Sequence, residues 1–353
     1  MNRNIFFPLA SIGIGLVFAL VLMELLLRVT GSAPTSGLLS VTNEEFERIP
    51  GLWSPGQAVV QRTIKELPYE VNINWAGYRG RDFEETKAPG ELRILMSGDS
   101  FTFGSYVDND DTLPSQLEQQ LAETCSAQPV TVLNAAVGGS TIVTQTELIQ
   151  RGLKLNPDLV VLVFHDNDLN DLNSPIWEDM ARNRDLKDSW FMSVFWPVLR
   201  KTALWNFALR VRGAMRVDES DEYETGVLTP EIVNSRANLS RIYNHKLREL
   251  ATSLAQAGQP FAFVTYPGHR PVLGEETLVG LVETGVEAGN ASGAPTLNLL
   301  PSLRSTLSTE IERGYLLPHD GHPSRVGHSI AAQAVSEFLL EQPVVADACK
   351  PVG

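Results

Sequence analysis

Cysteine and clustered basic residues are scarce in this chain of 353 residues. The only two cysteines, Cys125 and Cys349, lie far apart in sequence, and this spacing excludes a clustered zinc motif. The formal net charge is -14, and no run is rich in lysine and arginine. Because phosphate binding needs clustered cations, this composition argues against nucleic acid as a partner. We expect a substrate that is neutral, or one that is recognised by a few residues at the site and not by the overall charge of the protein.

The sequence also lacks internal repeats and low-complexity tracts, and its hydrophobic content of 43% is that of a globular protein with a sizeable core. The two cysteines leave two alternatives open. In an oxidising compartment they form one disulfide that ties the C-terminal tail to the end of a helix. Otherwise they are two unrelated free thiols.

Residues 5–27 contain a single ionisable residue, Glu24, and are flanked by Arg3 and Arg28. This apolar run is long enough to cross a bilayer and longer than the apolar core of a cleaved signal peptide. We therefore predict that residues 1–29 form a single-pass transmembrane anchor, with a cleaved signal as the alternative. The flanking arginines nearly balance, so they decide little about orientation. We expect an extracytoplasmic, periplasmic domain, because an N-terminal signal-anchor commonly exports one.

Composition divides the rest of the chain. Residues 30–70 are rich in proline, glycine and charged residues and show little periodicity, which indicates a stalk. We expect a compact domain at residues 71–345 and a tail at residues 346–353. Within that domain, residues 185–216 interleave tryptophan and phenylalanine with arginine and lysine. We interpret this stretch as a helical insertion that covers the sheet edge or the site, or alternatively as a surface for membrane, acyl or glycan contact.

Short apolar runs alternate with helical stretches along the compact domain. The runs expected to be buried strands are residues 93–96, 130–134, 159–164, 261–265 and 297–300. The clearest helical stretches are residues 141–155, 230–257 and 329–340. Strands that alternate with helices imply right-handed crossovers. We predict an α/β fold whose parallel sheet is covered on both faces.

Ser100 stands in the sequence Gly98-Asp99-Ser100, directly after a predicted strand and before a predicted helix. Open α/β sheets bind ligands at the carboxyl ends of their strands, so a serine at this position is a candidate nucleophile. Taken alone, the same residues also suit an ordinary strand-to-helix turn. A serine nucleophile further needs a histidine base, a carboxylate that orients the base, and donors for the oxyanion.

Three later segments offer those groups. Asp320 precedes His322 by two residues, just before a predicted helix. Gly139 lies in a glycine turn after the second predicted strand, and Asn167 follows the third strand. Because the carboxyl ends of parallel strands meet at one edge of the sheet, we expect these segments to lie together.

The segments occur in the order found in the SGNH (GDSL-type) hydrolase superfamily, which this chain resembles, in particular its membrane-anchored bacterial members. The matching residues are Gly98-Asp99-Ser100, Gly139, Asn167 with Asp168, and Asp320 with His322.

This resemblance implies a flavodoxin-like, three-layer α/β/α sandwich. It also implies that Ser100 attacks an acyl carbonyl while His322 takes the serine proton and Asp320 holds the imidazole. The Ser100 N–H, the Gly139 N–H and the Asn167 side chain would then bind the oxyanion.

Two positions depart from the usual pattern of the superfamily. The acid usually stands three residues before the histidine, where this chain has His319, whereas Asp320 stands two residues before it. Alginate-acetylating members also use the shorter spacing, so Asp320 is the predicted acid. His165 replaces the glycine that usually stands two residues before the oxyanion asparagine. A side chain there can narrow the pocket or contact substrate.

Further polar residues follow the predicted strands. The predicted substrate contacts are His165, Asp168, His269 and Arg270. For Asp168, as for Asp166, the alternative is hydrogen bonds to loop amides near the site, and for His269 and Arg270 it is a plain turn. The acidic residues after the third strand fail as a calcium loop, because Asp171 stands where glycine is needed and Trp177 where glutamate is needed. We predict neither a metal nor another cofactor.

Together these residues predict a serine esterase that cleaves O-acyl esters, with acetyl groups on cell-envelope glycans as the expected substrate. One alternative is an O-acyltransferase that passes the acyl group from Ser100 to a sugar hydroxyl, which the spacing of Asp320 and His322 favours. The other is a non-catalytic glycan-binding protein that keeps the fold without turnover, for which His165 in place of glycine is the support.

Overall fold

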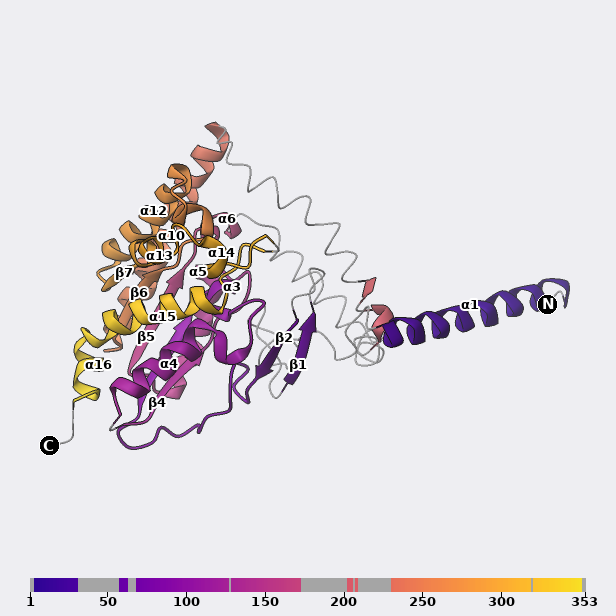
Figure 1. The fold of residues 1–353 in the computed structure, drawn as a ribbon, viewed down its shortest axis with the longest axis horizontal. Helices are drawn as coiled ribbons and strands as arrows, with labels where there is room; N and C mark the ends of the chain where they lie inside the picture. The colour runs from indigo at the N-terminus through magenta and orange to yellow at the C-terminus, as the bar shows by residue number, and fades with distance from the viewer. Residues whose placement is uncertain are drawn as a thin grey trace. The chain divides into compact units, whose positions relative to one another are not determined.

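The computed structural model describes residues 3–30, 57–62, 68–126, 128–172, 202–205, 207–208, 230–318 and 320–350. The chain divides into two compact units. One contains helix α1 (Arg3–Thr30) together with residues 202–205, and the other contains the main sheet and the residues predicted to react (Figure 1).

Five parallel strands form the main sheet. In spatial order they are β4 (Val130–Asn134), β3 (Leu92–Ser97), β5 (Leu159–Phe164), β6 (Phe261–Thr265) and β7 (Thr296–Asn298). Counted along the chain from β3, this is the 2-1-3-4-5 order of flavodoxin-like folds. The predicted α/β fold with a flavodoxin-like parallel sheet is confirmed.

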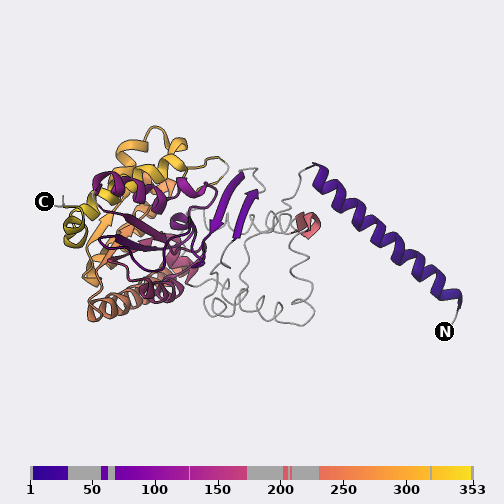
Figure 2. The same cartoon turned by 90° about the horizontal axis from the view of Figure 1, so that it is seen from below.

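Helices bury both faces of this sheet (Figure 2). Along β5, alternate side chains enter two different core clusters, one set beginning at Leu159 and the other at Val160. The helices α4 (Leu113–Thr124), α13 (Leu300–Leu307) and α15 (Arg325–Leu340) contribute to the first cluster. The helices α5 (Ile142–Gly152), α10 (Pro230–Gln256) and α12 (Glu276–Ser292) contribute to the second. Burial on both faces is the physical reason that β5 is apolar throughout.

The remaining elements are short. They are β1 (Gln57–Arg62), β2 (Pro68–Ile73), α3 (Ser100–Phe103), η1 (Asn109–Asp111), η2 (Leu153–Leu155), α6 (Asn167–Asp171), α11 (His269–Val272), α14 (Ile311–Gly314) and α16 (Pro343–Ala348). Most of the predicted stalk and of the predicted insertion lies outside the described residues.

Three predicted element boundaries were wrong by two residues or more. The helix expected over residues 141–155 ends at Gly152, where the 3-10 helix η2 follows. The expected strand at residues 297–300 ends at Asn298, because Leu300 already begins α13 with a proline in its first turn. The closing helix begins at Arg325 instead of residue 329. Its start is fixed by Ser324, whose hydroxyl accepts hydrogen bonds from two backbone N–H groups of the first turn.

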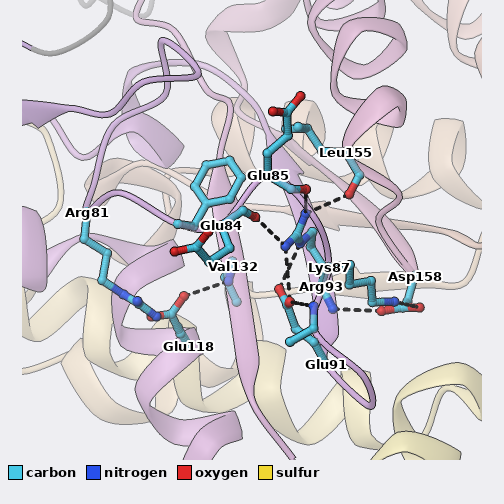
Figure 3. A network of polar contacts seen from close by, with 12 residues as sticks. Arg81, Glu84, Glu85, Lys87, Glu91, Arg93, Glu118, Val132, Leu155 and Asp158 are labelled. Atoms are coloured by element: carbon cyan, nitrogen blue, oxygen red, sulfur yellow. Dashed lines mark hydrogen bonds and ion pairs between the residues drawn. The ribbon is translucent and has the colours of Figure 1, made fainter.

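A buried arginine ties the amino end of β3 to its surroundings (Figure 3). The side chain of Arg93 is 1% exposed, and its five N–H donors all have acceptors. Two go to the carboxylate of Glu91, at 2.8 and 3.1 Å, and three go to the carbonyls of Glu84, Glu85 and Leu155. A charge this deep is tolerated because it is both paired and fully hydrogen-bonded.

A disulfide joins Cys125 and Cys349, whose Cα atoms are 4.3 Å apart. It ties the residue that follows α4 to the residue that follows α16. Of the two alternatives left open by the sequence, the structure has the disulfide.

Helix α1 is apolar enough to cross a membrane over Gly13–Thr30, with a mean hydropathy of 2.0. Its single acidic residue in the apolar run, Glu24, forms an ion pair with Arg28 at 2.6 Å. The Glu24 carboxylate also accepts the backbone N–H groups of Ala203 and Leu204, at 3.0 and 2.9 Å. These partners explain how a carboxylate is accommodated in an otherwise apolar helix. The length and composition of α1 are typical of a membrane anchor or a signal sequence.

Candidate active site

The serine predicted to react lies in a sharp turn between β3 and α3. Asp99 is the N-cap of α3, and its Oδ1 accepts the Phe101 N–H at 2.9 Å. Gly98 is required by the close approach of its neighbours, since an added Cβ would lie 2.3 Å from Thr102 Oγ1 and 2.9 Å from the Val163 carbonyl oxygen. The turn therefore needs glycine and aspartate at these positions and places Ser100 as the first residue of the helix.

Ser100, His322 and Asp320 form a continuous hydrogen-bonded chain. Ser100 Oγ lies 2.9 Å from His322 Nε2, and His322 Nδ1 lies 2.5 Å from Asp320 Oδ1. The same carboxylate oxygen accepts the backbone N–H of His322 at 2.9 Å. These contacts let the imidazole accept a proton at Nε2 while Nδ1 donates to the carboxylate, which is the arrangement of a nucleophile, a base and an orienting acid.

The loop that carries the histidine is held by its own backbone. The N–H of Leu316 donates to the carbonyl of His322, and the N–H of Asp320 donates to the carbonyl of Leu316, each at 2.9 Å. Tyr315, which is fully buried, anchors the start of the loop through its hydroxyl, which donates to the carbonyl of Pro267 at 2.8 Å. His319, the residue at the usual acid position, lies outside the described residues.

The predicted oxyanion donors lie on the turns after β3, β4 and β5. The Asp99 carboxylate accepts the Phe101 N–H. Within the described residues, no acceptor is found for the Ser100 N–H. An added Cβ at Gly138 would lie 3.7 Å from Ser100 Cβ, so the glycine turn containing Gly139 passes beside the nucleophile. Gly139 has φ of 71°, a conformation that favours glycine.

A hydrogen bond fixes this glycine turn to the nucleophile turn, because the hydroxyl of Ser140 donates to the Gly98 carbonyl at 2.8 Å. Asn167, the third predicted oxyanion donor, begins α6. Its Oδ1 is buried and has no hydrogen-bond partner among the described residues.

Asp168, the residue after Asn167, is fully buried, and its carboxylate is hydrogen-bonded within the protein. Its carboxylate accepts the Gln145 side-chain amide and the His165 N–H, each at 3.3 Å. Burial, followed by the charge of Asp99, raises its pKa well above the usual range. The structure places this predicted substrate contact in the protein interior, where it links α5 to the turn after β5.

His165 is also buried, with 7% of its surface exposed. Its Nδ1 lies 2.8 Å from the Tyr266 carbonyl oxygen, and its Nε2 lies 3.0 Å from Asp166 Oδ1. Its ring stacks on Phe101, with centroids 3.6 Å apart. Both ring nitrogens are therefore used within the protein, although the residue was predicted as a substrate contact.

His269 and Arg270 begin the short helix α11. An added Cβ at Gly321 would lie 3.2 Å from the His269 ring, so this histidine packs against the loop that carries the base. Arg270 forms a two-pronged ion pair with Glu275, at 2.7 and 2.9 Å. Of these two predicted contacts, the structure brings His269 next to the Asp320–His322 loop.

Aromatic rings around the base were not predicted from the sequence. The rings of Phe101 and Tyr106 both lie 5.2 Å from the His322 ring. Phe101 follows the nucleophile directly, and that adjacency is the signal that could have found it. Tyr106 has φ of 67°, which is rare for a bulky residue and unreadable in a sequence.

A cavity of about 250 Å³ lies elsewhere on the same unit, between β4 and the start of α4. Arg79, Arg81 and Glu118 are among its lining residues, and none of the predicted site residues is. Within the described residues, no group of three or more histidine, cysteine, aspartate or glutamate side chains could hold a metal ion.

A serine that follows a strand of a flavodoxin-like sheet and is hydrogen-bonded to a histidine and, through it, to an aspartate has the arrangement of a serine hydrolase. The sequence matches the model of the GDSL-like Lipase/Acylhydrolase family over residues 96–330, so the chain belongs to this family. It is a hydrolase that acts on ester bonds.

Solved structures with a similar arrangement have low sequence identity to this chain. The acetylxylan esterase Axe2 from Geobacillus stearothermophilus is 15% identical, with a TM-score of 0.44, over 71% of this chain and 95% of its own. LAE5, an alpha/beta hydrolase enzyme from the metagenome of Lake Arreo, is 14% identical, with a TM-score of 0.43, over 70% of this chain and 94% of its own. No curated protein matches the sequence.

Proposed function

We propose that the protein is a serine esterase that cleaves O-acyl esters through an acyl-enzyme on Ser100. The observation that carries this proposal is the hydrogen bond of 2.9 Å between Ser100 Oγ and His322 Nε2, continued by the bond from His322 to Asp320. A serine hydroxyl is a weak nucleophile until a base removes its proton, and this geometry supplies the base.

The reaction proceeds in two halves. Ser100 Oγ attacks the ester carbonyl as His322 takes its proton, and the oxyanion is bound by the N–H groups of Ser100 and Gly139 and by the Asn167 amide. His322 then gives the proton to the leaving alkoxide, which departs as an alcohol. Water, deprotonated by His322, attacks the acyl-enzyme and releases the carboxylic acid and free Ser100.

The proposed substrate is a short acyl group, acetyl in the first instance, on a cell-envelope glycan. His165 stands where the resemblance leads one to expect a glycine, and its ring stacks on Phe101, the residue that follows Ser100. This added side chain supports a short acyl group. The proposed location is the periplasmic side of a membrane, with α1 as the anchor. The apolar α1 and the disulfide between Cys125 and Cys349 support it, because disulfides persist in oxidising compartments.

Hydrolysis of aryl esters of increasing chain length by the full chain in detergent tests this proposal. We expect acetyl and propionyl esters to be cleaved faster than octanoyl esters, and Ser100→Ala to abolish the activity while the fold is kept. Cleavage that is unchanged in Ser100→Ala would refute the role of Ser100, and a preference for the octanoyl ester would refute the short-acyl assignment.

The spacing of Asp320 and His322 also favours a second outcome, in which the acyl group passes to a sugar hydroxyl. The same acyl-enzyme serves both reactions, so the acceptor decides between them. With an acyl donor and an acetyl-free oligosaccharide present together, a transferase yields acylated oligosaccharide. A product that is entirely free acid would exclude transfer to that acceptor.

A further inference from the structure

The ring of His165 meets an acceptor at each nitrogen. The Tyr266 carbonyl lies 2.8 Å from Nδ1, and Asp166 Oδ1 lies 3.0 Å from Nε2. A neutral imidazole has one N–H and can satisfy only one of two acceptors, whereas an imidazolium satisfies both. The geometry at a residue that is 7% exposed therefore fits the charged form.

The surrounding charges agree with this protonation state. Burial lowers the pKa of His165, but the charges of Asp166 and Asp99 and the hydrogen bonds to Asp166 and the Tyr266 carbonyl outweigh it and raise the pKa to about 10. The histidine thus keeps its proton across the neutral range.

The charged ring is one aromatic side chain away from the base. His165 stacks on Phe101, with centroids 3.6 Å apart and planes inclined by 20°, and the Phe101 ring lies 5.2 Å from His322. A cation over the face of an aromatic ring is held there electrostatically as well as by packing. Phe101 directly follows Ser100, so this stack fixes the residue next to the nucleophile.

The same charge faces the carboxylate of Asp99, the residue that precedes the reacting serine. Asp99 is fully buried and interacts electrostatically with His165. An oxyanion that develops on the substrate beside Ser100 is repelled by negative charge in this low-dielectric region. A fixed cation near this carboxylate offsets that repulsion as the oxyanion forms.

We propose that His165 is a permanently charged positioning residue, whose imidazolium holds Phe101 in place and offsets the buried carboxylate of Asp99 as charge develops on the oxyanion. This inference rests on the proposed function of Ser100. Because the charge acts on the transition state and His165 makes no contact through either nitrogen to substrate, its loss lowers kcat and leaves KM nearly unchanged.

His165→Gln removes the charge and keeps a hydrogen-bonding side chain of similar length. We expect kcat for a short aryl ester to fall about 10- to 100-fold, the range for loss of one unit charge several ångströms away at an effective dielectric constant of about 20, with KM within about twofold. The matched control is His245→Gln, a histidine with a side chain 65% exposed on α10, for which both constants stay at the wild-type values. An unchanged kcat in His165→Gln, or a loss confined to KM, overturns the inference.

Nitrogen NMR of the wild-type chain labelled at histidine gives a second readout that does not depend on folding of the variant. At pH 8 the imidazole nitrogens of His165 are expected to give the paired signals of a doubly protonated ring, identified by comparison with the His165→Gln spectrum or by their contacts to Phe101. The separated signals of a neutral tautomer overturn the inference. If the wild-type chain cleaves no ester, the proposed function fails, whereas activity with a neutral His165 defeats the further inference alone.

Discussion

Strand β3 carries a polar cluster at each end, and the two clusters differ in whether their hydrogen-bonding groups are all used. At the amino end, all five donors of Arg93 have acceptors and the pair with Glu91 is sealed from solvent. At the carboxyl end, Ser100 Oγ has a partner in His322, but within the described structure no acceptor is found for the Ser100 backbone N–H.

This difference separates a structural cluster from a reactive one. A saturated polar network stabilises the fold and has nothing left to offer a ligand. Donors without acceptors cost stability, and they persist where a substrate supplies the missing partner. Changes at the amino end should therefore alter stability, and changes at the carboxyl end should alter activity.

The largest expected effect is that of Asp320→Asn on turnover. The amide can no longer hold the imidazole in the tautomer that accepts the serine proton, and kcat should fall about 10⁴-fold with little change in thermal stability. Asp347→Asn, a change at a side chain 70% exposed on α16, is the matched control and should leave kcat unchanged. A loss of less than about tenfold in Asp320→Asn would assign the orienting role to another residue.

Arg93→Met should reverse that pattern. It leaves the Glu91 carboxylate buried without its partner, so we expect the free energy of unfolding to fall by about 3 to 5 kcal/mol, with kcat of the folded fraction unchanged. Denaturant titration measures the first quantity and ester hydrolysis measures the second. Arg81→Met is the control, because its side chain is 67% exposed and its ion pair with Glu118 should contribute less than about 1 kcal/mol. Equal losses in the two variants would show that the buried network contributes no more than a surface pair.

Removal of the disulfide is a further change that we expect to lower stability and to leave activity unchanged. Its partners are separated by 224 residues, so it restricts a long segment of the unfolded chain. Replacing both cysteines with serine should lower the free energy of unfolding by about 2 to 5 kcal/mol. Ester hydrolysis at a temperature where the variant is folded should match that of the wild type, and a specific loss of kcat would show that the C-terminal helix reaches the site.

The smallest expected effect concerns His328. Like His165 it is a buried histidine, but its pKa is shifted in the opposite direction. Burial, with Arg79 and His322 as lesser causes, lowers its pKa from 6.5 to about 3, so the folded protein holds it neutral. A depressed folded-state pKa contributes stability above pH 6.5 that is lost as the pH falls toward 3. Between pH 7 and pH 5 the wild type should therefore lose about 2 kcal/mol more than His328→Phe. Parallel pH dependence of the two unfolding free energies would show that this histidine does not titrate as described.

Much of the fold could be predicted from the sequence, because strands buried on both faces are apolar throughout. Residues 130–134, 159–164 and 261–265 match β4, β5 and β6 residue for residue. The short edge strand β7 was harder to delimit, since its three residues carry little pattern before α13 begins.

The site was predictable where a motif placed a residue directly after a strand, and not where contacts are formed across the sheet. Ser100 and His322 could be paired only through a resemblance, because 222 residues separate them. The environment of His165 depends on the Tyr266 carbonyl, 101 residues away, and on stacking with Phe101. The burial of Arg93 runs against the usual exposure of arginine, so no local pattern indicated its network.

The most direct test of the account is reaction of the full chain with a fluorophosphonate probe, followed by peptide mass spectrometry. An activated serine is required for labelling, so we predict that the modified peptide contains Ser100 and that Ser100→Ala is unlabelled. Labelling that persists in Ser100→Ala, or no labelling in a wild-type protein that cleaves esters, would contradict the assignment of Ser100 as the nucleophile.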